Sequence, residues 1–260
     1  MPGTGNSAVC AFDDCVLSTG EGTSFEAGYA CDFDGVTDCI LPSGDSLTCF
    51  NPFNDVDYKV SFFAKSTSSR FKHNGTVISV GQTTTQNPRF SIKFINDGGS
   101  NSKLVIISNL MSATSTYSIT PAVCQSWNHY MIVVTQGATQ TIEIYINNVL
   151  VDTLTPSTYT ITDSSVSLQI GSSKGSSAFN VFEGRLAEIS LGVGSTSAQE
   201  IADLYNQNDP QTSMNGIVNY YKFSEPVGTV VGNITDSMGS DDLTMSGFAL
   251  PNGIVSDQPF

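Results

Sequence analysis

Hydrophobic and polar residues alternate in short runs along most of this chain, and turn-forming residues separate one run from the next. A period of two places the hydrophobic side chains on one face of an extended segment, which is the pattern of a half-buried β-strand. Runs that recur roughly every 8–15 residues are typical of a β-sandwich or jelly roll. The predicted strands cover residues 57–64, 76–80, 89–95, 103–108, 127–135, 166–170 and 182–191.

Residues 141–151 predict a β-hairpin. Three isoleucines at positions 142, 144 and 146 share one face of the first strand, and Val149-Leu150-Val151 begins the returning strand. Asn147-Asn148 lies between them. Because Asn tolerates a positive φ, this pair can form the tight two-residue turn that hairpins favour.

One short helix is predicted near residues 197–206. Ser197 and Glu200 have the spacing of a capping box, in which the Ser oxygen accepts from a backbone amide and the Glu side chain reaches back to the cap. Ile201, Leu204 and Tyr205 then form one apolar stripe. We expect the helix to end at residues 206–208, ahead of Pro210.

The charge balance excludes several classes of partner. The chain has 260 residues, with 10 Lys and Arg against 24 Asp and Glu, and a net charge of -14. We therefore expect no nucleic-acid binding, which depends on Lys and Arg that release counterions, and no docking on anionic membranes. A hydrophobic fraction of 39% excludes a disordered acidic tail. No apolar run reaches the ~20 residues that cross a bilayer, and the first residues do not have the pattern of a signal peptide.

The cysteines favour a reduced protein. A zinc site is not expected, because there is no C-x-x-C pair and His73 and His129 are the only histidines. Disulfides stay open as an alternative, but without a signal peptide we favour free structural thiols, which behave as small hydrophobic groups when buried. The six cysteines are Cys10, Cys15, Cys31, Cys39, Cys49 and Cys124.

Six segments resemble, in the same order, motifs of the laminin-G-like, concanavalin A-like lectin/glucanase jelly-roll family. The resemblance covers about residues 24–208 and implies an all-β jelly-roll sandwich. The segments read YACDFDGVTD at 29–38, YKVSFFA at 58–64, WNHYMIVV at 127–134, EIYINNVLVD at 143–152, FEGRLAEI at 182–189 and SAQEIADLYN at 197–206.

The end of the chain resembles the beginning of the same family. Residues 216–225, GIVNYYKFSE, are similar to the family's opening strand, which normally comes before the Phe-Asp-Gly turn. We therefore expect an N-terminal segment at 1–23, a jelly roll at 24–208 and a permuted C-terminal part at 209–260. The strands of this last part either complete the same sandwich or pair with a neighbouring copy, since an unpaired edge is costly. The arrangement is also similar to that of jelly-roll proteins in tailed phages and other viruses.

The residues do not predict an enzyme. Retaining glucanases need two carboxylates ~5 Å apart, which on one strand reads Glu-x-Asp-x-Glu, and that triplet is missing. Strict alternation would give Glu188 the uncharged same-face neighbours Leu186 and Ser190. We interpret His129 as a histidine packed within a strand, and Trp127 as a core residue rather than a platform for a sugar.

Asp32, Asp34 and Asp38 form a local carboxylate cluster and are the candidate metal ligands. Oxygen ligands suit Ca²⁺, and the resemblance implies calcium at the rim of lectin-like domains. The alternative is that these residues cap the backbone of a turn. No other cofactor is expected. The candidate rim for a glycan adds Asn180, while the carbohydrate-binding residues themselves stay unassigned.

Two functions fit these expectations. The first is a non-enzymatic structural protein on the surface of a virion, such as a capsid decoration, head fibre or spike of a bacteriophage, where it would contact other capsid proteins and form a homo-oligomer. The second is a lectin-like carbohydrate-binding module, extracellular or on a cell surface, that adheres to host or mucus glycans with or without calcium.

Overall fold

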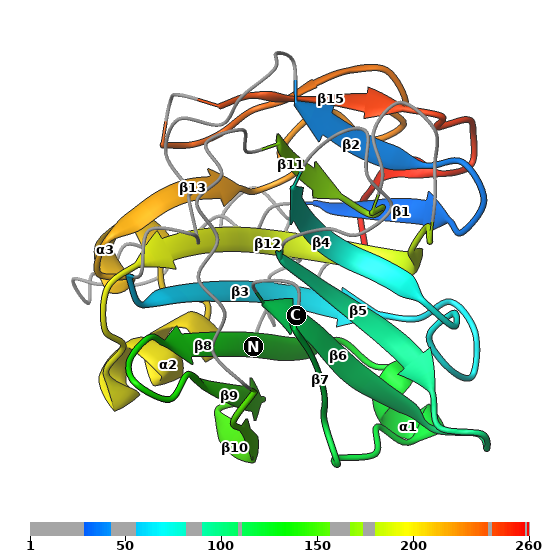
Figure 1. The fold of residues 1–260 in the computed structure, drawn as a ribbon. Helices are drawn as coiled ribbons and strands as arrows, with labels where there is room; N and C mark the ends of the chain where they lie inside the picture. The colour runs from blue at the N-terminus through cyan, green and yellow to red at the C-terminus, as the bar shows by residue number, and fades with distance from the viewer. Residues whose placement is uncertain are drawn as a thin grey trace, which may run out of the picture.

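The fold consists of two antiparallel β-sheets packed face to face, as the resemblance predicted (Figure 1). The structure is a computed structural model, and it describes residues 29–42, 56–81, 90–108, 111–156, 167–173, 180–238, 241–257 and 259. In sheet A the spatial order is β10 (Val149–Leu154), β9 (Thr141–Ile146), β8 (Asn128–Thr135), β3 (Tyr58–Lys65), β12 (Glu183–Val193), β1 (Ala30–Asp34) and β16 (Gly253–Val255), with β13 (Ile217–Tyr221) also paired to β12. In sheet B it is β14 (Gly232–Ile234), β15 (Leu243–Ser246), β2 (Cys39–Pro42), β11 (Ser167–Ile170), β4 (Gly75–Gly81), β5 (Phe90–Asn96), β6 (Ser102–Ser108) and β7 (Met111–Thr114).

The alternating pattern fills the space between the two sheets. On β9 the three isoleucines are buried in the central core, while Thr141, Glu143 and Tyr145 are partly exposed. Asn147 and Asn148 have φ angles of 51° and 63°, and the two strands pair across them. The predicted hairpin is therefore confirmed, together with its turn.

The predicted helix is α2 (Ala198–Tyr205), and Ser197 caps it by accepting a hydrogen bond from the Glu200 amide at 3.1 Å. The Glu200 side chain does not follow the capping-box prediction, because its Oε1 pairs with Lys59 Nζ at 2.6 Å instead. The described residues also include two four-residue helices, α1 (Pro121–Cys124) and α3 (Pro210–Ser213). Pro210 starts α3 because proline lacks only an amide that the first turn leaves unpaired.

The C-terminal strands join both sheets of this chain. β13 pairs with the second half of β12, where Tyr220 lies opposite Ser190, and β16 pairs with β1. In sheet B, β15 lies between β14 and β2, so that the last strands in the sequence lie beside the first ones (Figure 1). The segment between β13 and β15 contains β14. The division into domains stays a prediction.

Three of the six cysteines lie in the described part of the chain. Cys31, Cys39 and Cys124 are buried, free thiols. Cys10, Cys15 and Cys49 fall outside the described residues. The expectation of buried structural thiols therefore holds for these three.

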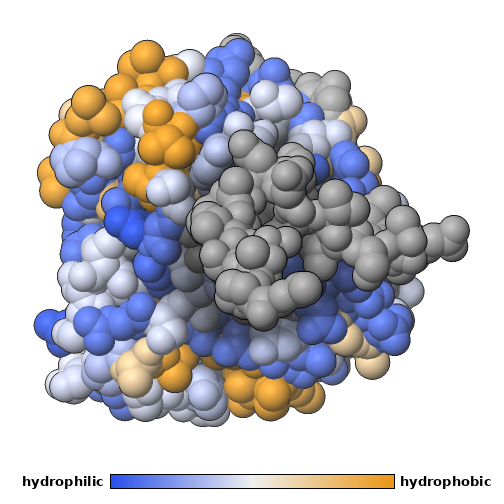
Figure 2. All heavy atoms as spheres, turned by 180° about the vertical axis from the view of Figure 1, so that it is seen from behind, coloured by the Kyte–Doolittle hydropathy of each residue, from blue (hydrophilic) through white to orange (hydrophobic). Residues whose placement is uncertain are grey.

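Hydrophobic groups also occur at the surface. Seen from behind, they gather at the upper left of the molecule (Figure 2). The most exposed hydrophobic side chains among the described residues are those of Val36, Val149, Val231 and Leu250. Such groups occur at interaction surfaces, and the homo-oligomer stays a prediction. No described helix has the length and hydropathy to cross a membrane.

Candidate functional site

The candidate site lies on the outer face of sheet A, which is the face turned away from the central core. On β3 the residues at the even positions 58, 60, 62 and 64 belong to the central core. The residues at odd positions, from Lys59 to Lys65, therefore face outward. One half of this face is covered by α2 and α3. Met131 and Val133 of β8 pack there against Ile201 and Leu204 of α2, together with Met214.

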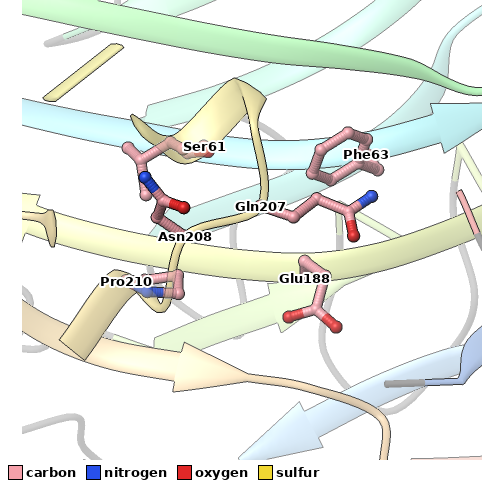
Figure 3. Close-up of a pocket in the computed structure, with 7 residues that line it drawn as sticks. Ser61, Phe63, Glu188, Gln207, Asn208 and Pro210 are labelled. Carbon is pink, nitrogen blue, oxygen red and sulfur yellow. The ribbon is translucent and has the colours of Figure 1, made fainter. Parts of the chain in front are cut away.

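A small pocket opens where α2 and α3 meet the sheet (Figure 3). Its empty volume is about 230 Å³, including the solvent at its mouth. In the view of Figure 3 the amide of Gln207 lies between the ring of Phe63 and the carboxylate of Glu188. The pocket therefore combines one aromatic ring with carboxylate, amide and hydroxyl groups. Its lining residues are Ser61, Phe63, Glu188, Leu204, Gln207, Asn208 and Pro210.

A β-bulge brings Glu188 into this pocket. The pairing of β12 with β3 shifts between Ala187 and Ser190, and Glu188 has a φ of 52°. The extra residue breaks the alternation, so Ala187 and Glu188 both lie on the outer face. The predicted pairing of Glu188 with Leu186 on one face is wrong, because Leu186 lies in the central core.

Glu188 accepts a hydrogen bond from the hydroxyl of Tyr220, which lies on β13. Burial, reinforced by this carboxylate, raises the pKa of Tyr220 far above its usual value, so the phenol stays protonated and acts as the donor. Glu188 is the one carboxylate among the lining residues. The pocket thus lacks the pair of carboxyl groups that a retaining glucanase needs.

Ser61 and His129 meet at the base of the same face. Ser61 Oγ lies 2.7 Å from His129 Nε2, and both side chains are buried. Burial lowers the pKa of His129 to about 3, so the ring is neutral at ordinary pH. A catalytic Ser–His pair needs a third group that orients the histidine. His129 Nδ1 has no hydrogen-bond partner within the described part of the chain, so this pair lacks that group. His129 is a strand-packed residue, as predicted.

The side chain of Gln207 contains another polar atom that, like Nδ1 of His129, has no hydrogen-bond partner among the described residues. Its Nε2 is buried and makes no hydrogen bond within the described residues, and its backbone φ is 57°. Gln207 follows α2 directly after the C-cap at Asn206, where a left-handed residue commonly ends a helix. Unpaired buried polar atoms are rare and need an explanation, and the Nε2 donor of Gln207 lies in a residue that lines the pocket.

A second group of polar residues lies on the outer face next to Phe63, and we call it the Trp127 patch. It consists of Trp127, Lys65, Arg185, Asp257 and Asp32. Trp127 was predicted as a core residue; it is partly buried and packs against the small hydrophobic cluster of Ala30, Phe63 and Ala187, which is separate from the central core. Trp127 Nε1 donates to Asp257 Oδ1 at 3.2 Å, while Lys65 and Arg185 both bind Asp257 Oδ2.

Asp32 does not share a site with the other two predicted metal ligands. Its Oδ2 lies 3.3 Å from Arg185 Nη2 in the Trp127 patch. Asp34 Oδ1 instead accepts the backbone amides of Val36 and Thr37 at 2.6 and 2.8 Å, and Asp38 Oδ2 accepts the Asp34 amide at 2.7 Å. These contacts are those of the turn-capping alternative.

The two carboxylates that cap this turn, those of Asp34 and Asp38, have pKa values shifted in opposite directions. Burial, together with the nearby carboxylates of Asp34 and Asp32, raises the pKa of Asp38 to about 7. Burial opposes the shift of Asp34, but the backbone amides that Asp34 accepts hold its pKa below the usual value. Among the described residues no three His, Cys, Asp or Glu side chains gather as a metal site needs. The calcium site stays a prediction.

Asn180 lies before β12, at a φ of 53°. Its carbonyl accepts from the Thr76 amide at 2.9 Å, and its Nδ2 donates to Ser173 at 3.3 Å. It lines neither the pocket nor the Trp127 patch. Sequence reasoning missed Gln207, Lys65, Arg185 and Asp257, and it placed Glu188 on the same face as Leu186. The only sequence signals are that Arg185 alternates with hydrophobic residues in the predicted strand 182–191 and that Lys65 directly follows the predicted strand 57–64.

Comparisons with known proteins agree on the fold. A laminin-G family model, described as the concanavalin A-like lectin/glucanases superfamily, matches residues 43–202. No curated protein matches the sequence. A heptameric SAP-like pentraxin from Limulus polyphemus is similar at a TM-score of 0.57 with 12% identity, and the match covers 85% of this chain and 96% of the pentraxin. A candidate carbohydrate-binding protein from Bacteroides ovatus also has a TM-score of 0.57, with 16% identity, and the match covers 86% of this chain and 62% of that protein.

Proposed function

The chain belongs to the concanavalin A-like lectin/glucanase superfamily, and from this we propose that it is a non-enzymatic, lectin-like module that binds carbohydrate on the outer face of sheet A. The observation that carries the proposal is the pocket in which Phe63, Glu188 and Gln207 lie together. A sugar ring has an apolar C–H face and a rim of hydroxyl groups, so an aromatic ring beside a carboxylate and an amide suits it. Folds host many functions, so the argument rests on this site.

The pocket is a shallow recess and not an enclosed cavity, because its empty volume of about 230 Å³ includes the open solvent at its mouth. Phe63 and Glu188 are 3% and 6% exposed. We therefore expect a terminal sugar unit to lie across the mouth, with one edge directed at these residues. A carboxylate accepts hydrogen bonds from hydroxyl groups, and the unpartnered Nε2 of Gln207 can donate one.

A glycan array with the purified full chain tests the proposal, followed by isothermal titration of the sugars that bind. Gln207→Asn shortens the amide by one methylene and keeps a residue that tolerates a positive φ. We expect it to weaken binding at least tenfold. Gln199→Asn makes the same chemical change on an exposed residue of α2 and serves as the matched control. A blank array, or equal affinities for both variants and the wild type, would refute the proposal.

Calcium and location are further parts of the proposal. The array is run with Ca²⁺ and with a chelator, and a calcium-assisted site predicts binding that the chelator removes. A carbohydrate-binding module of this kind acts outside the cell or on its surface. The surface of a virion is a third setting, and the virion role stays a prediction. Mass spectrometry of purified virus particles tests it by detecting the chain or failing to do so.

A further inference from the structure

Asp257 of the C-terminal tail lies in a ready-made carboxylate site. Three donors meet its two oxygens: the indole N–H of Trp127 reaches Oδ1, and the side chains of Lys65 and Arg185 reach Oδ2. Burial alone would raise the pKa of Asp257, but these three hydrogen bonds lower it, so the carboxylate is ionised. The side chains of Lys65, Arg185 and Asp257 are 21%, 27% and 27% exposed, so the site is open to solvent.

The sheet holds the donors in place independently of the tail. Arg185 lies directly opposite Lys65 in the pairing of β12 with β3. Trp127 comes one residue before β8, which pairs with β3 on its other side. The donors therefore come from three adjacent strands, whereas Asp257 lies beyond the end of β16.

The two cations lie together at an energetic cost. Like charges directly opposite on neighbouring strands are destabilising, and the chain has only 10 basic residues in 260. Asp32, which lies opposite Arg185 on β1, neutralises part of the charge through Nη2 of Arg185 at 3.3 Å. Arg185 Nε is buried and has no hydrogen-bond partner among the described residues. This site thus has more hydrogen-bond donors than the described acceptors of the protein satisfy.

We propose that Lys65, Arg185 and Trp127 form a subsite for the carboxylate of an acidic sugar, and that Asp257 occupies this subsite as an internal competitor until the sugar displaces it. This inference rests on the proposed function and names its ligand class, a glycan with a uronic-acid-type carboxylate. The acidic sugar replaces a group of the same charge and geometry. Trp127 offers its N–H to one oxygen and its ring to the sugar's apolar face.

The overall charge of -14 selects against larger polyanions. Charges on other parts of the surface are screened beyond about 8 Å at physiological ionic strength, so one carboxylate interacts mainly with Lys65, Arg185 and the partly neutralising Asp32. A nucleic acid or other polyanion would extend over the acidic remainder of the surface and be repelled. Competition by Asp257 lowers the apparent affinity for the sugar, because only the fraction of molecules whose subsite is free can bind it.

The test is a fluorescence titration, because Trp127 is the only tryptophan of the chain and donates to Asp257. The probes are glucuronate and its neutral amide, glucuronamide, which share one ring. Asp257→Asn keeps the shape of the tail and removes its charge. We expect this variant to bind glucuronate at least tenfold more tightly than the wild type does, with less than a twofold change for glucuronamide. Asp97→Asn makes the same change of net charge in an exposed turn and should leave both affinities unchanged.

A second variant distinguishes a sugar-binding subsite from a contact that only holds the C-terminal tail in place. Arg185→Met in the Asp257→Asn background should lose the gain for glucuronate, with folding checked by circular dichroism. If Asp257→Asn lowers only the free energy of unfolding and leaves glucuronate affinity unchanged, the inference is wrong. Should the wild type bind neutral glycans on the array while neither Asp257 variant prefers glucuronate, the inference fails and the proposed function stands. If no sugar of either kind binds, both fail.

Discussion

The buried ion pair between Lys59 and Glu200 joins α2 to sheet A, and its removal gives a quantitative test of the site's architecture. Lys59 Nζ lies 2.6 Å from Glu200 Oε1, and the two side chains are 0% and 5% exposed. Lys59 also donates to the carbonyl of Ser195 at 3.0 Å, just before the helix begins. Lys59→Met keeps most of the volume of the lysine stem and removes its charge, so Glu200 is left buried without its cation.

The expected cost follows from the burial of the pair. At 2.6 Å and an effective dielectric constant of ~20, the Coulomb attraction is about 6 kcal/mol. Desolvation of both ions cancels much of this attraction, but removal of one partner leaves the other uncompensated and typically costs about 3–5 kcal/mol. That cost is a large share of the ~5–15 kcal/mol by which folded domains are stable. The double variant Lys59→Met/Glu200→Leu removes both charges and should recover most of the loss.

Urea unfolding of the wild type, both single variants and the double variant gives the coupling free energy through a double-mutant cycle. Lys103→Met makes the same substitution on β6 of sheet B, and serves as the control for the loss of one lysine. A loss below 1 kcal/mol for Lys59→Met, or a coupling energy near zero, would show that the pair does not hold α2 on the sheet. The reasoning about the covered half of the outer face would then be refuted.

Three further outcomes are expected. Ser197→Ala should lower the free energy of unfolding by about 1 kcal/mol in urea titrations, because it removes the acceptor for the Glu200 amide. Asn147→Gly should cost about 1 kcal/mol more than Asn148→Gly in the same titrations, since Asn147 Oδ1 also accepts from the backbone of β8. Asp38, whose pKa is raised to about 7 by burial, stabilises the fold fully below its unfolded pKa of ~3.9 and loses this contribution as pH rises toward 7, so Asp38→Asn should flatten the decline in stability between pH 4 and 8.

Local patterns predicted the parts of the fold whose signal lies within one run of neighbouring residues. The β9–β10 hairpin and α2 are examples, because a period of two, a pair of asparagines and a cap are all properties of neighbouring residues. The strands that were missed are short. β7, β14 and β16 have four, three and three residues, which is too few to show a period. Tertiary pairing with longer strands forms them.

The site was predicted less well, because its residues are brought together by register. Lys65 and Arg185 are 120 positions apart in the sequence, and Trp127 lies between them. Only the pairing of three strands brings these residues together. Asp257 comes from the tail, 72 residues after Arg185. By contrast, Asp34 and Asp38 lie within one turn, so their capping role was foreseeable from spacing alone.

Several positions at which simple sequence rules fail lie on the outer face of sheet A, while others lie elsewhere, such as Phe223 with a φ of 56° in the central core. Glu188 breaks the alternation of β12 and takes a left-handed backbone conformation, which costs roughly 1–2 kcal/mol for a residue with a side chain. Gln207 buries an unpaired amide nitrogen, and Arg185 and Lys65 place like charges side by side. A fold selected for stability alone would relieve each of these costs with one substitution. Their coincidence on the outer face of sheet A, around Phe63, is what a binding surface predicts, because strain and unsatisfied polar groups persist where a ligand compensates them.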